Sequence, residues 1–425
     1  MSESGRPPIL PPSTGPIWAQ PKMAVLVLMG VASGLPLYLT SRALQAWLRT
    51  AQVDLTTIGL FSLVALPYSL KWIWAPIVDH YVPPFLGRRR GWLLILQLAL
   101  VVAIGVLALQ DPHRGLKLVA ISAMAVAFFS ASQDIVIDAY RTDILTDSER
   151  GFGAAGWVLG YRIGLLAAGA LAFVLADRWS WPAAYLAMAG LLGLSMVATI
   201  VAKEPEPTGA RPARFRDAVT LPFRDFFARW GAGRAVGILL FVVLYKYPDY
   251  LAASVATPFL LDLRFSQTDI GAIQGGVGIL ATIVGAVIGG WLVARIGLAR
   301  SLWVAGGLQA ISNLAYYGLS LAAADRGLLV GAIVAENVCA GATGTVFIAF
   351  LMSLCDARFS AAQYALLSGL MGASRDVLVA PAGAIAESTG WPVFFLVTLL
   401  VAVPGLLLLP FFAPWTRSAR SPAPL

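Results

Sequence analysis

Five basic residues lie inside apolar stretches that are long enough to cross a lipid bilayer. They are Arg42, Lys71, Arg162, Lys246 and Arg375. A charge at the centre of a membrane costs about 2.5–3.5 kcal/mol even on the lenient insertion scale, so each residue needs a buried counter-ion, water or an anionic ligand. These five residues are therefore the first candidates for binding a substrate.

Three acidic residues also lie in apolar stretches of this length, and Asp134, Asp249 and Glu336 are candidates for carrying protons. Desolvation disfavours the charged form of a buried carboxylate, so such a group can take up a proton and release it when its access to water changes. Asp249 follows Lys246 by one helical turn, and the two can pair. Pro248 between them removes a backbone donor, which predicts a broken helix with a titratable pair. A purely structural ion pair at a kink is the alternative.

The composition indicates a polytopic membrane protein. Of the 425 residues, 59% are hydrophobic and only 12% are charged, and the mean hydropathy is +0.79. Soluble domains carry about 25% charged residues. Apolar windows of about 20 residues predict twelve membrane-spanning helices, over residues 23–47, 56–79, 91–110, 116–140, 152–176, 182–202, 234–260, 268–293, 301–322, 328–355, 361–386 and 392–413.

The distribution of charge follows membrane topology. The net charge is +8, and most lysines and arginines fall in the two tails and in the even-numbered loops. By the positive-inside rule, both ends of the chain are expected in the cytoplasm. Residues 1–20 are polar and rich in proline, unlike a signal peptide, so the first span is expected to act as the targeting signal.

The predicted spans divide into two related sets of six. One constant shift superposes Pro36 on Pro248 and Tyr38 on Tyr250; chance recurrence is the alternative. Six helices per half give both halves the same orientation, so the predicted fold is an all-α membrane protein with two parallel six-helix repeats, the major facilitator fold. The expected parts are a cytoplasmic tail over 1–22, a half over 23–202, a linker over 203–233, a half over 234–413 and a cytoplasmic tail over 414–425.

The repeat places Arg162 and Arg375 near the middle of the fifth span of each half, across a shared cavity. Guanidinium groups bind carboxylates in a forked geometry, so both are candidates for gripping an anionic substrate. Asp134, Asp249 and Glu336 are their alternative partners.

Two other basic residues and two amides complete the substrate candidates. Arg42 lies toward the end of the first span and can extend to the interface, which favours a structural role. Lys71 lies deeper, between tryptophans. Gln274 and Asn337 can hydrogen bond to sugar hydroxyls or amides, although amides in membrane helices more often serve packing.

The linker contains a candidate interfacial helix. Leu221, Phe223, Phe226, Phe227 and Trp230 are expected to share one apolar face of it. An ordinary positively charged connection between the halves is the alternative.

A loop motif suggests where a gate lies. Residues 75–80 and 87–90 resemble a stretched form of the signature between the second and third helices of major facilitator transporters. The resemblance implies a gate at this loop. The predicted gating and conformational residues are Asp79, Arg88, Arg89, Asp138, Arg141, Pro36 and Pro248; for Asp138 a structural ion pair is favoured.

Longer strings resemble the AmpG-type muropeptide permeases. They include residues 33–41, 44–47, 130–139, 149–155, 244–246 and 363–368. The resemblance implies a bacterial inner-membrane importer of GlcNAc-1,6-anhydro-MurNAc, with or without peptide, driven by proton symport. It also implies roles in peptidoglycan recycling and β-lactamase induction. Lys246 matches the family, whereas Tyr247-Pro248 departs from the Leu-Gly expected there.

Other classes of function are less compatible with the residues. A carrier of another anionic amphiphile and an exporter remain open, as does a membrane sensor or scaffold. An enzyme is not expected, because no nucleophile motif occurs. No cofactor or metal is expected either: Cys339 and Cys355 are about 24 Å apart on one helix, and His80 and His113 fall at opposite membrane faces. The protein is expected to be a monomer that contacts lipid, cargo and protons and no nucleic acid.

Overall fold

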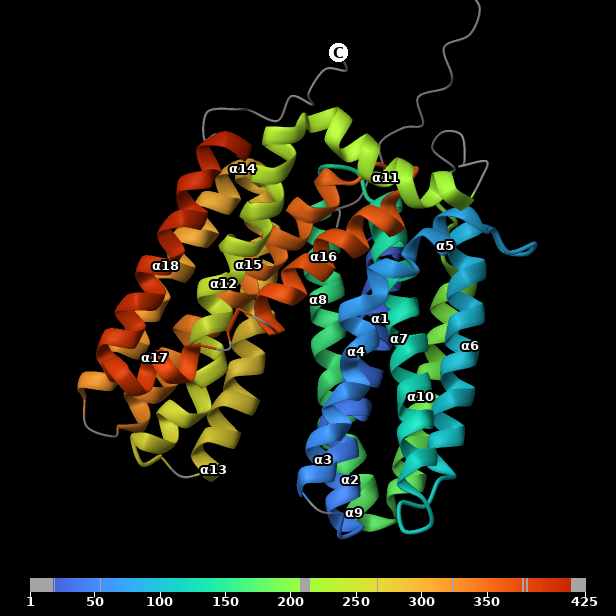
Figure 1. The fold of residues 1–425 in the computed structure, drawn as a ribbon, viewed down its shortest axis with the longest axis horizontal. Coiled ribbons are helices and arrows are strands. Elements are labelled where there is room, and N and C mark those ends of the chain that lie inside the picture. Colours follow the sequence, from blue (N-terminus) through green and yellow to red (C-terminus); the bar gives the residue numbers. More distant parts are fainter. Residues whose placement is uncertain are drawn as a thin grey trace, which may run out of the picture.

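A computed structural model shows two helical bundles side by side, with α11 (Phe215–Trp230) crossing one end (Figure 1). It describes residues 18, 20–53, 55–206, 215–265, 267–322, 325–376, 378–379 and 381–413. We call the end that carries α11 the linker end and the opposite end the far end.

The first bundle contains helices α1 to α10 and the second contains α12 to α18. The first set is α1 (Pro21–Tyr38), α2 (Leu44–Thr50), α3 (Leu55–Leu60), α4 (Leu66–Leu70), α5 (Ala75–His80), α6 (Arg88–Ala108), α7 (Leu116–Ile144), α8 (Arg150–Leu166), α9 (Ala172–Arg178) and α10 (Trp181–Val201). The second is α12 (Ala232–Asp262), α13 (Gln267–Ile270), α14 (Gly278–Leu321), α15 (Arg326–Leu354), α16 (Ser360–Asp376), α17 (Ala382–Thr389) and α18 (Trp391–Phe412).

Nine helical stretches among the described residues are long and apolar enough to cross a membrane. Nine stretches match twelve predicted spans because two spans are joined into one stretch and two others are divided into shorter helices. The eighth and ninth spans form one stretch, with a kink at Gly297 between them. Its φ of 79° is a left-handed value that glycine adopts without strain.

The second and eleventh spans are each divided into shorter helices. The second is split into α3, α4 and α5 by 3₁₀ turns, with Pro67 and Pro76 in the first turns of the latter two. The eleventh ends as α16 and resumes as α17 after Pro381. Proline cannot donate to a helical hydrogen bond, which accounts for such interruptions. These two spans contact each other across the bundles, through α16 with α4 and α5.

The prediction of a broken helix at Pro248 is wrong. α12 continues from Ala232 to Asp262 through both Pro248 and Pro258. One proline removes a single donor from a long helix that is packed against α14, α16 and α18. The remaining hydrogen bonds and the tertiary packing preserve the helix.

Glycines bring helix pairs within each bundle into backbone contact. A Cβ on Gly160 of α8 would lie 1.8 Å from the carbonyl oxygen of Val27 in α1. In the second bundle, a Cβ on Gly285 of α14 would lie 2.0 Å from the carbonyl of Val338 in α15. Small residues permit this approach in membrane helices. The closely packed pairs hold α8 and α15 firmly beside the space between the bundles.

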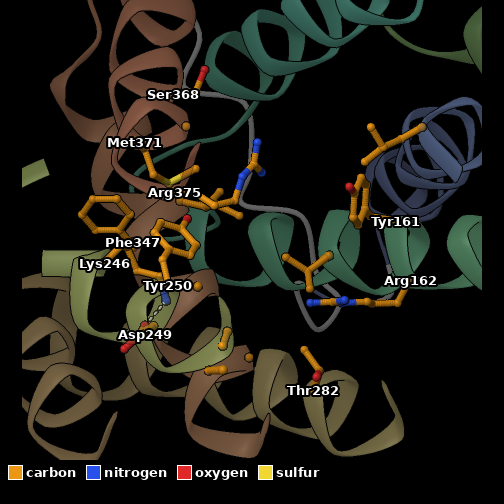
Figure 2. Close-up of a pocket in the computed structure, with 18 of the residues that line it drawn as sticks. Tyr161, Arg162, Lys246, Asp249, Tyr250, Thr282, Phe347, Ser368, Met371 and Arg375 are labelled. Atoms are coloured by element: carbon orange, nitrogen blue, oxygen red, sulfur yellow. Dashed lines mark hydrogen bonds and ion pairs between the residues drawn. The ribbon is translucent and has the colours of Figure 1, made fainter. Parts of the chain in front are cut away.

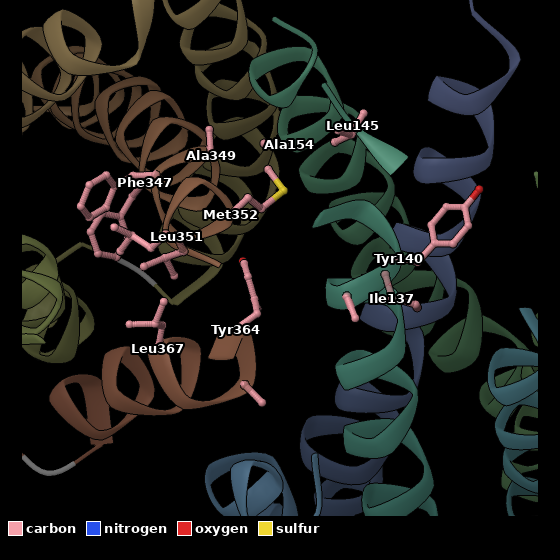
Figure 3. Close-up of a cluster of buried hydrophobic side chains, with 14 of the residues drawn as sticks. Ile137, Tyr140, Leu145, Ala154, Phe347, Ala349, Leu351, Met352, Tyr364 and Leu367 are labelled. Carbon is pink, nitrogen blue, oxygen red and sulfur yellow. The ribbon is translucent and has the colours of Figure 1, made fainter. Parts of the chain in front are cut away.

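The two bundles share a hydrophobic core only at the linker end, as far as the structure is described. One buried cluster combines residues of both bundles, as Figure 3 shows for Ile137 and Ala154 with Phe347 and Leu367. It includes Phe226 of α11. Two further clusters lie toward the far end, each within one bundle. The bundles are therefore joined at the linker end and separate toward the far end.

α11 binds to the linker ends of both bundles. Its Asp225 accepts hydrogen bonds from Arg358 and Gln363, both at 3.0 Å, in the second bundle. Its Phe215 ring packs edge-on against His80 of the first bundle. The predicted single apolar face is divided: Phe226 is buried in protein, whereas Phe223 and Phe227 are exposed. The expected face is split because the helix packs on two bundles as well as facing outward.

The loop before α16 supplies a pH-dependent contact. Asp356 accepts hydrogen bonds from the backbone nitrogen of Arg358 at 2.8 Å and from its Nε at 2.9 Å. Burial opposes ionisation of Asp356, but the bonds from Arg358 outweigh it and hold its pKa below the ordinary value of 3.8. The stability from this contact is therefore present above that value and is lost as the pH falls through the lower pKa of the folded state.

Replacing Asp356 by asparagine tests this pH dependence. We expect the melting temperature of the variant to lie below that of the wild type by a constant amount between pH 7 and 5, and the difference to shrink below about pH 4. Thermal unfolding in detergent across this range measures it. A difference that grows as the pH falls would contradict the assignment.

Candidate functional site

A cavity of about 530 Å³ lies between the two bundles. This volume is typical of sites for small ligands. It is lined by residues of α1, α4, α7 and α8 on one side and of α12, α14, α15 and α16 on the other. Eleven of the predicted substrate, proton and gating residues line the cavity. They are Lys71, Asp134, Asp138, Arg141, Arg162, Lys246, Asp249, Gln274, Glu336, Asn337 and Arg375.

Two arginines enter the cavity from opposite bundles (Figure 2). Arg162 comes from α8 and Arg375 from the last turn of α16. Arg162 makes no ion pair within the described part of the chain, and its buried Nε has no hydrogen-bond partner there. A planar fork of this kind can bind a carboxylate from the cavity.

Lys246 and Asp249 form a buried ion pair on α12. Their side chains are 7% and 8% exposed, and Lys246 Nζ donates to Asp249 Oδ2. The Lys246 ammonium lies 5.8 Å from the centre of the Tyr250 ring, within range of a cation–π contact. The pair faces the cavity from the second bundle (Figure 2).

A second charged group lies toward the linker end. Asp138 accepts from Lys71 Nζ at 3.2 Å and from Arg141 Nη2 at 2.8 Å, so one carboxylate serves two cations. The Arg141 guanidinium lies between the rings of Trp157, at 4.3 Å, and Tyr364, at 4.9 Å. It also donates to the Tyr364 hydroxyl. Because Tyr364 belongs to α16, this group joins the two bundles beneath the cavity.

Asp134 and Glu336 differ from the other acids because neither forms an ion pair within the described residues. Asp134 accepts a hydrogen bond from the Ser33 hydroxyl. Glu336 is half-buried in the cavity wall, where it interacts electrostatically with Asp249, Lys246 and Arg162.

The formal charge of the cavity depends on these two acids. Its lining has five basic groups, Lys71, Arg141, Arg162, Lys246 and Arg375, and four acidic groups, Asp134, Asp138, Asp249 and Glu336. With all of them ionised the balance is 5 − 4 = +1, and with Asp134 and Glu336 protonated it is 5 − 2 = +3. Protonation therefore favours an anionic ligand.

The amide candidates and Arg42 occupy different places. Gln274 accepts from the Thr257 hydroxyl at 3.3 Å, and Asn337 accepts from the Thr282 hydroxyl at 3.0 Å, both at the cavity. Arg42 is exposed in the π-helical turn that follows α1 and is absent from the cavity lining. Pro36 lies buried in α1, just before the same turn, and its carbonyl accepts from the Thr40 hydroxyl.

The predicted gating residues form a network at the linker end. Arg89, which is 1% exposed, donates to Asp79 at 3.1 Å, to Asp143 at 2.8 Å and to the hydroxyl of Ser360 at 2.6 Å. Asp79 also accepts from the backbone nitrogen of Ala362 at 2.9 Å. This nitrogen is in the first turn of α16, where a helix dipole favours a negative charge. Asp79 and Arg89 thus hold the first bundle against the second.

Arg88 reinforces the same junction. It donates to Asp143 at 3.4 Å within the first bundle and to the carbonyl of Ala357 at 3.2 Å in the second.

Sequence reasoning missed the aromatic side chains of the site. Tyr68, Trp157, Tyr161 and Tyr316 line the cavity, and Trp157 stacks on Tyr161 at 5.3 Å. Aromatic residues are common in membrane helices, so their type alone gives no signal. Asp143 was also missed, although its place two residues after Arg141 at a helix end was a usable indication.

Comparisons with known proteins agree with this architecture. The family model "Major Facilitator Superfamily" matches residues 23–380. The chain is 46% identical, over 395 residues, to the protein "Anhydromuropeptide permease" of Escherichia coli (strain K12), covering 92% of this chain and 80% of that protein.

Solved structures show the same fold at low sequence identity. A bacterial homologue of the iron transporter ferroportin in an outward-facing state superposes with a TM-score of 0.70 at 15% identity, over 95% of this chain and 100% of the other. The proton:xylose symporter XylE gives a TM-score of 0.69 at 10% identity, over 93% and 95% of the two chains.

Proposed function

The chain belongs to the major facilitator superfamily and, within it, to the anhydromuropeptide permease family, and we propose that it imports anhydromuropeptides across the inner membrane by proton symport. The cargo is GlcNAc-1,6-anhydro-MurNAc, with or without its peptide. Members of the family are multi-pass membrane transporters and not enzymes.

The observation that carries the proposal is the cavity with arginines on both walls. An anhydromuropeptide offers carboxylates, amides and sugar hydroxyls. Arg162 and Arg375 line the cavity from different bundles, and their guanidinium groups suit the carboxylates. Gln274 and Asn337 suit the amides and hydroxyls, and the tyrosines suit the faces of the sugar rings.

Proton coupling rests on Asp134 and Glu336 in this proposal. Both lack an ion pair among the described residues, and both face the cavity. Protons on these acids raise the positive charge around the cargo, and the bound anion in turn favours the protonated acids. Cargo and protons therefore bind together, which is the requirement for symport.

The linker end is cytoplasmic in the proposed orientation, with both tails on that side. The structure then corresponds to a state whose cargo cavity is closed toward the cytoplasm. Transport requires the contacts of Arg89 with Asp79 and Ser360 to break and the far ends of the bundles to approach. A monomer contains the complete cavity.

Uptake into liposomes tests the function. We expect a labelled anhydromuropeptide to accumulate under an inwardly directed proton gradient and to stop accumulating when a protonophore is added. N,N′-diacetylchitobiose, a disaccharide without a carboxylate, serves as the control cargo and should neither accumulate nor compete. Accumulation that does not depend on the proton gradient would exclude symport. The absence of uptake by folded protein would exclude this cargo.

Replacing Arg162 by lysine keeps the charge but removes the fork. We expect the KM for the anhydromuropeptide to rise about ten-fold, because a bidentate, charge-assisted contact becomes a single one. The control is Arg42→Lys, the same change at an exposed site outside the cavity lining. Equal KM values for the two variants would place Arg162 outside the binding site.

A further inference from the structure

Two buried amides on α14 have no hydrogen-bond partner within the described residues. Gln309 is 3% exposed and Asn313 is fully buried. The amide nitrogen and the amide oxygen of each are all without a partner. A buried polar group without a partner destabilises the folded state, and buried amides in proteins are nearly always satisfied by protein or by water.

A small cavity lies beside the first of these amides. It is lined by Gln309 and Gly306 of α14, by Ala402 and Leu406 of α18, and by Pro248 and Asp249 of α12. About 10 Å³ of it is open to the centre of a water-sized sphere, which is close to the space that one buried water requires. Asn313 follows Gln309 by one turn and continues the polar strip on the same face.

A backbone carbonyl adds a further acceptor nearby. Pro248 has no N–H, so it cannot donate to the carbonyl of Leu244 four residues earlier. A Cβ on Gly405 of α18 would lie 3.1 Å from that oxygen, which places the carbonyl at the junction of α12 with α18. A buried water needs two to four polar partners. Gln309 and Asp249 in the cavity wall supply two, and the Leu244 carbonyl lies at the adjoining helix junction.

Asp249 lines both this small cavity and the large one between the bundles. We propose that Gln309 and Asn313 hold internal water behind α12, and that this water hydrates Asp249 from the side away from the cargo. Hydration lowers the cost of separating the carboxylate from Lys246 when the bundles move. The functional part of this inference rests on the proposed function, whereas the water site does not.

Radiolytic hydroxyl-radical labelling detects the site without any cargo. Tyr245 lines the small cavity and is only 6% exposed. We expect oxidation of Tyr245 in the wild type and its loss in Gln309→Met, which keeps the shape and removes the amide. Tyr185 is the control, since it is fully buried and its hydroxyl donates to the carbonyl of Leu39. An unlabelled Tyr245 in the wild type would overturn the water site.

Uptake by the same variants tests the functional part. In Gln309→Met and Asn313→Leu we expect an unchanged melting temperature and an initial uptake rate about ten-fold lower, as for the loss of a hydrogen bond to a charged group. The matched control is Gln97→Met, the same change at a buried glutamine of α6. Labelling lost with uptake retained would overturn the role in transport and leave the water site standing. Absent uptake by the wild type would overturn the proposed function and this role together, while the labelling still decides the water site.

Discussion

Replacing Lys246 by alanine is expected to lower the initial rate of anhydromuropeptide uptake at least about 100-fold and to destabilise the protein. The substitution leaves the buried carboxylate of Asp249 without its cation. Breaking one partner of a buried ion pair costs about 3–5 kcal/mol of stability. The loss of uptake has a separate cause, the ammonium that is missing from the cavity wall: a hydrogen bond to a charged group is worth about 3 kcal/mol, which corresponds to about 100-fold. Uptake into liposomes and thermal unfolding measure the two effects.

The double variant Lys246→Ala/Asp249→Ala separates transport from stability. Removing both charges of a buried pair is often neutral for stability, so the melting temperature should return toward that of the wild type. Uptake should stay as low as in the single variant, because the pair is then absent from the cavity wall. Recovery of uptake together with stability would show that the pair is structural and would contradict its role in transport.

The sequence was sufficient for the fold because the bilayer imposes a strong constraint. Each span must satisfy its own backbone hydrogen bonds, so long apolar windows identify the helices. The even division into halves followed from matches such as Pro36 with Pro248. The shared cavity of Arg162 and Arg375 was expected from the same repeat. Features that depend on one helix alone, or on the internal repeat, could therefore be predicted from the sequence.

Breaks within the spans were not accessible from hydropathy. The second span stays apolar through its 3₁₀ turns, so the divisions around α4 leave no mark in an apolar window. Proline gave an ambiguous signal. It accompanies the breaks at Pro67 and Pro381 but is tolerated at Pro248 in α12, where packing on several sides preserves the helix. The outcome depends on tertiary contacts that the local sequence does not specify.

The sequence also did not predict the direction in which a charged side chain points. Arg42 and Arg162 are both basic residues within apolar stretches, yet Arg162 lines the cavity and Arg42 does not. Hydropathy gives the depth of a residue in the membrane and not the side of the helix that meets the other bundle. The stacking of Arg141 between Trp157 and Tyr364 joins three helices and has no local signature.

Replacing Asp79 by asparagine is expected to change the equilibrium constant between the states closed and open at the linker end by about 100-fold, in favour of the open state. The asparagine keeps the size but cannot provide a carboxylate for Arg89 and for the backbone nitrogen of Ala362. Loss of one partner in a buried charged network costs about 3 kcal/mol, or about a factor of 100. Asp143 remains paired with Arg89, so the first bundle should keep its fold.

Fluorescence energy transfer between the far ends of the bundles measures this shift. Dyes on cysteines at positions 114 and 326, whose native arginine side chains are 89% and 74% exposed, report the separation once Cys339 and Cys355 are replaced by serine. Transfer should rise in Asp79→Asn, because the far ends approach when the linker end opens. The control is Asp147→Asn. The Asp147 carboxylate is 81% exposed and pairs with Arg150, and an exposed ion pair contributes little to stability. Unchanged transfer in Asp79→Asn would mean that the hydrophobic cluster around Tyr364, rather than this carboxylate, holds the linker end closed.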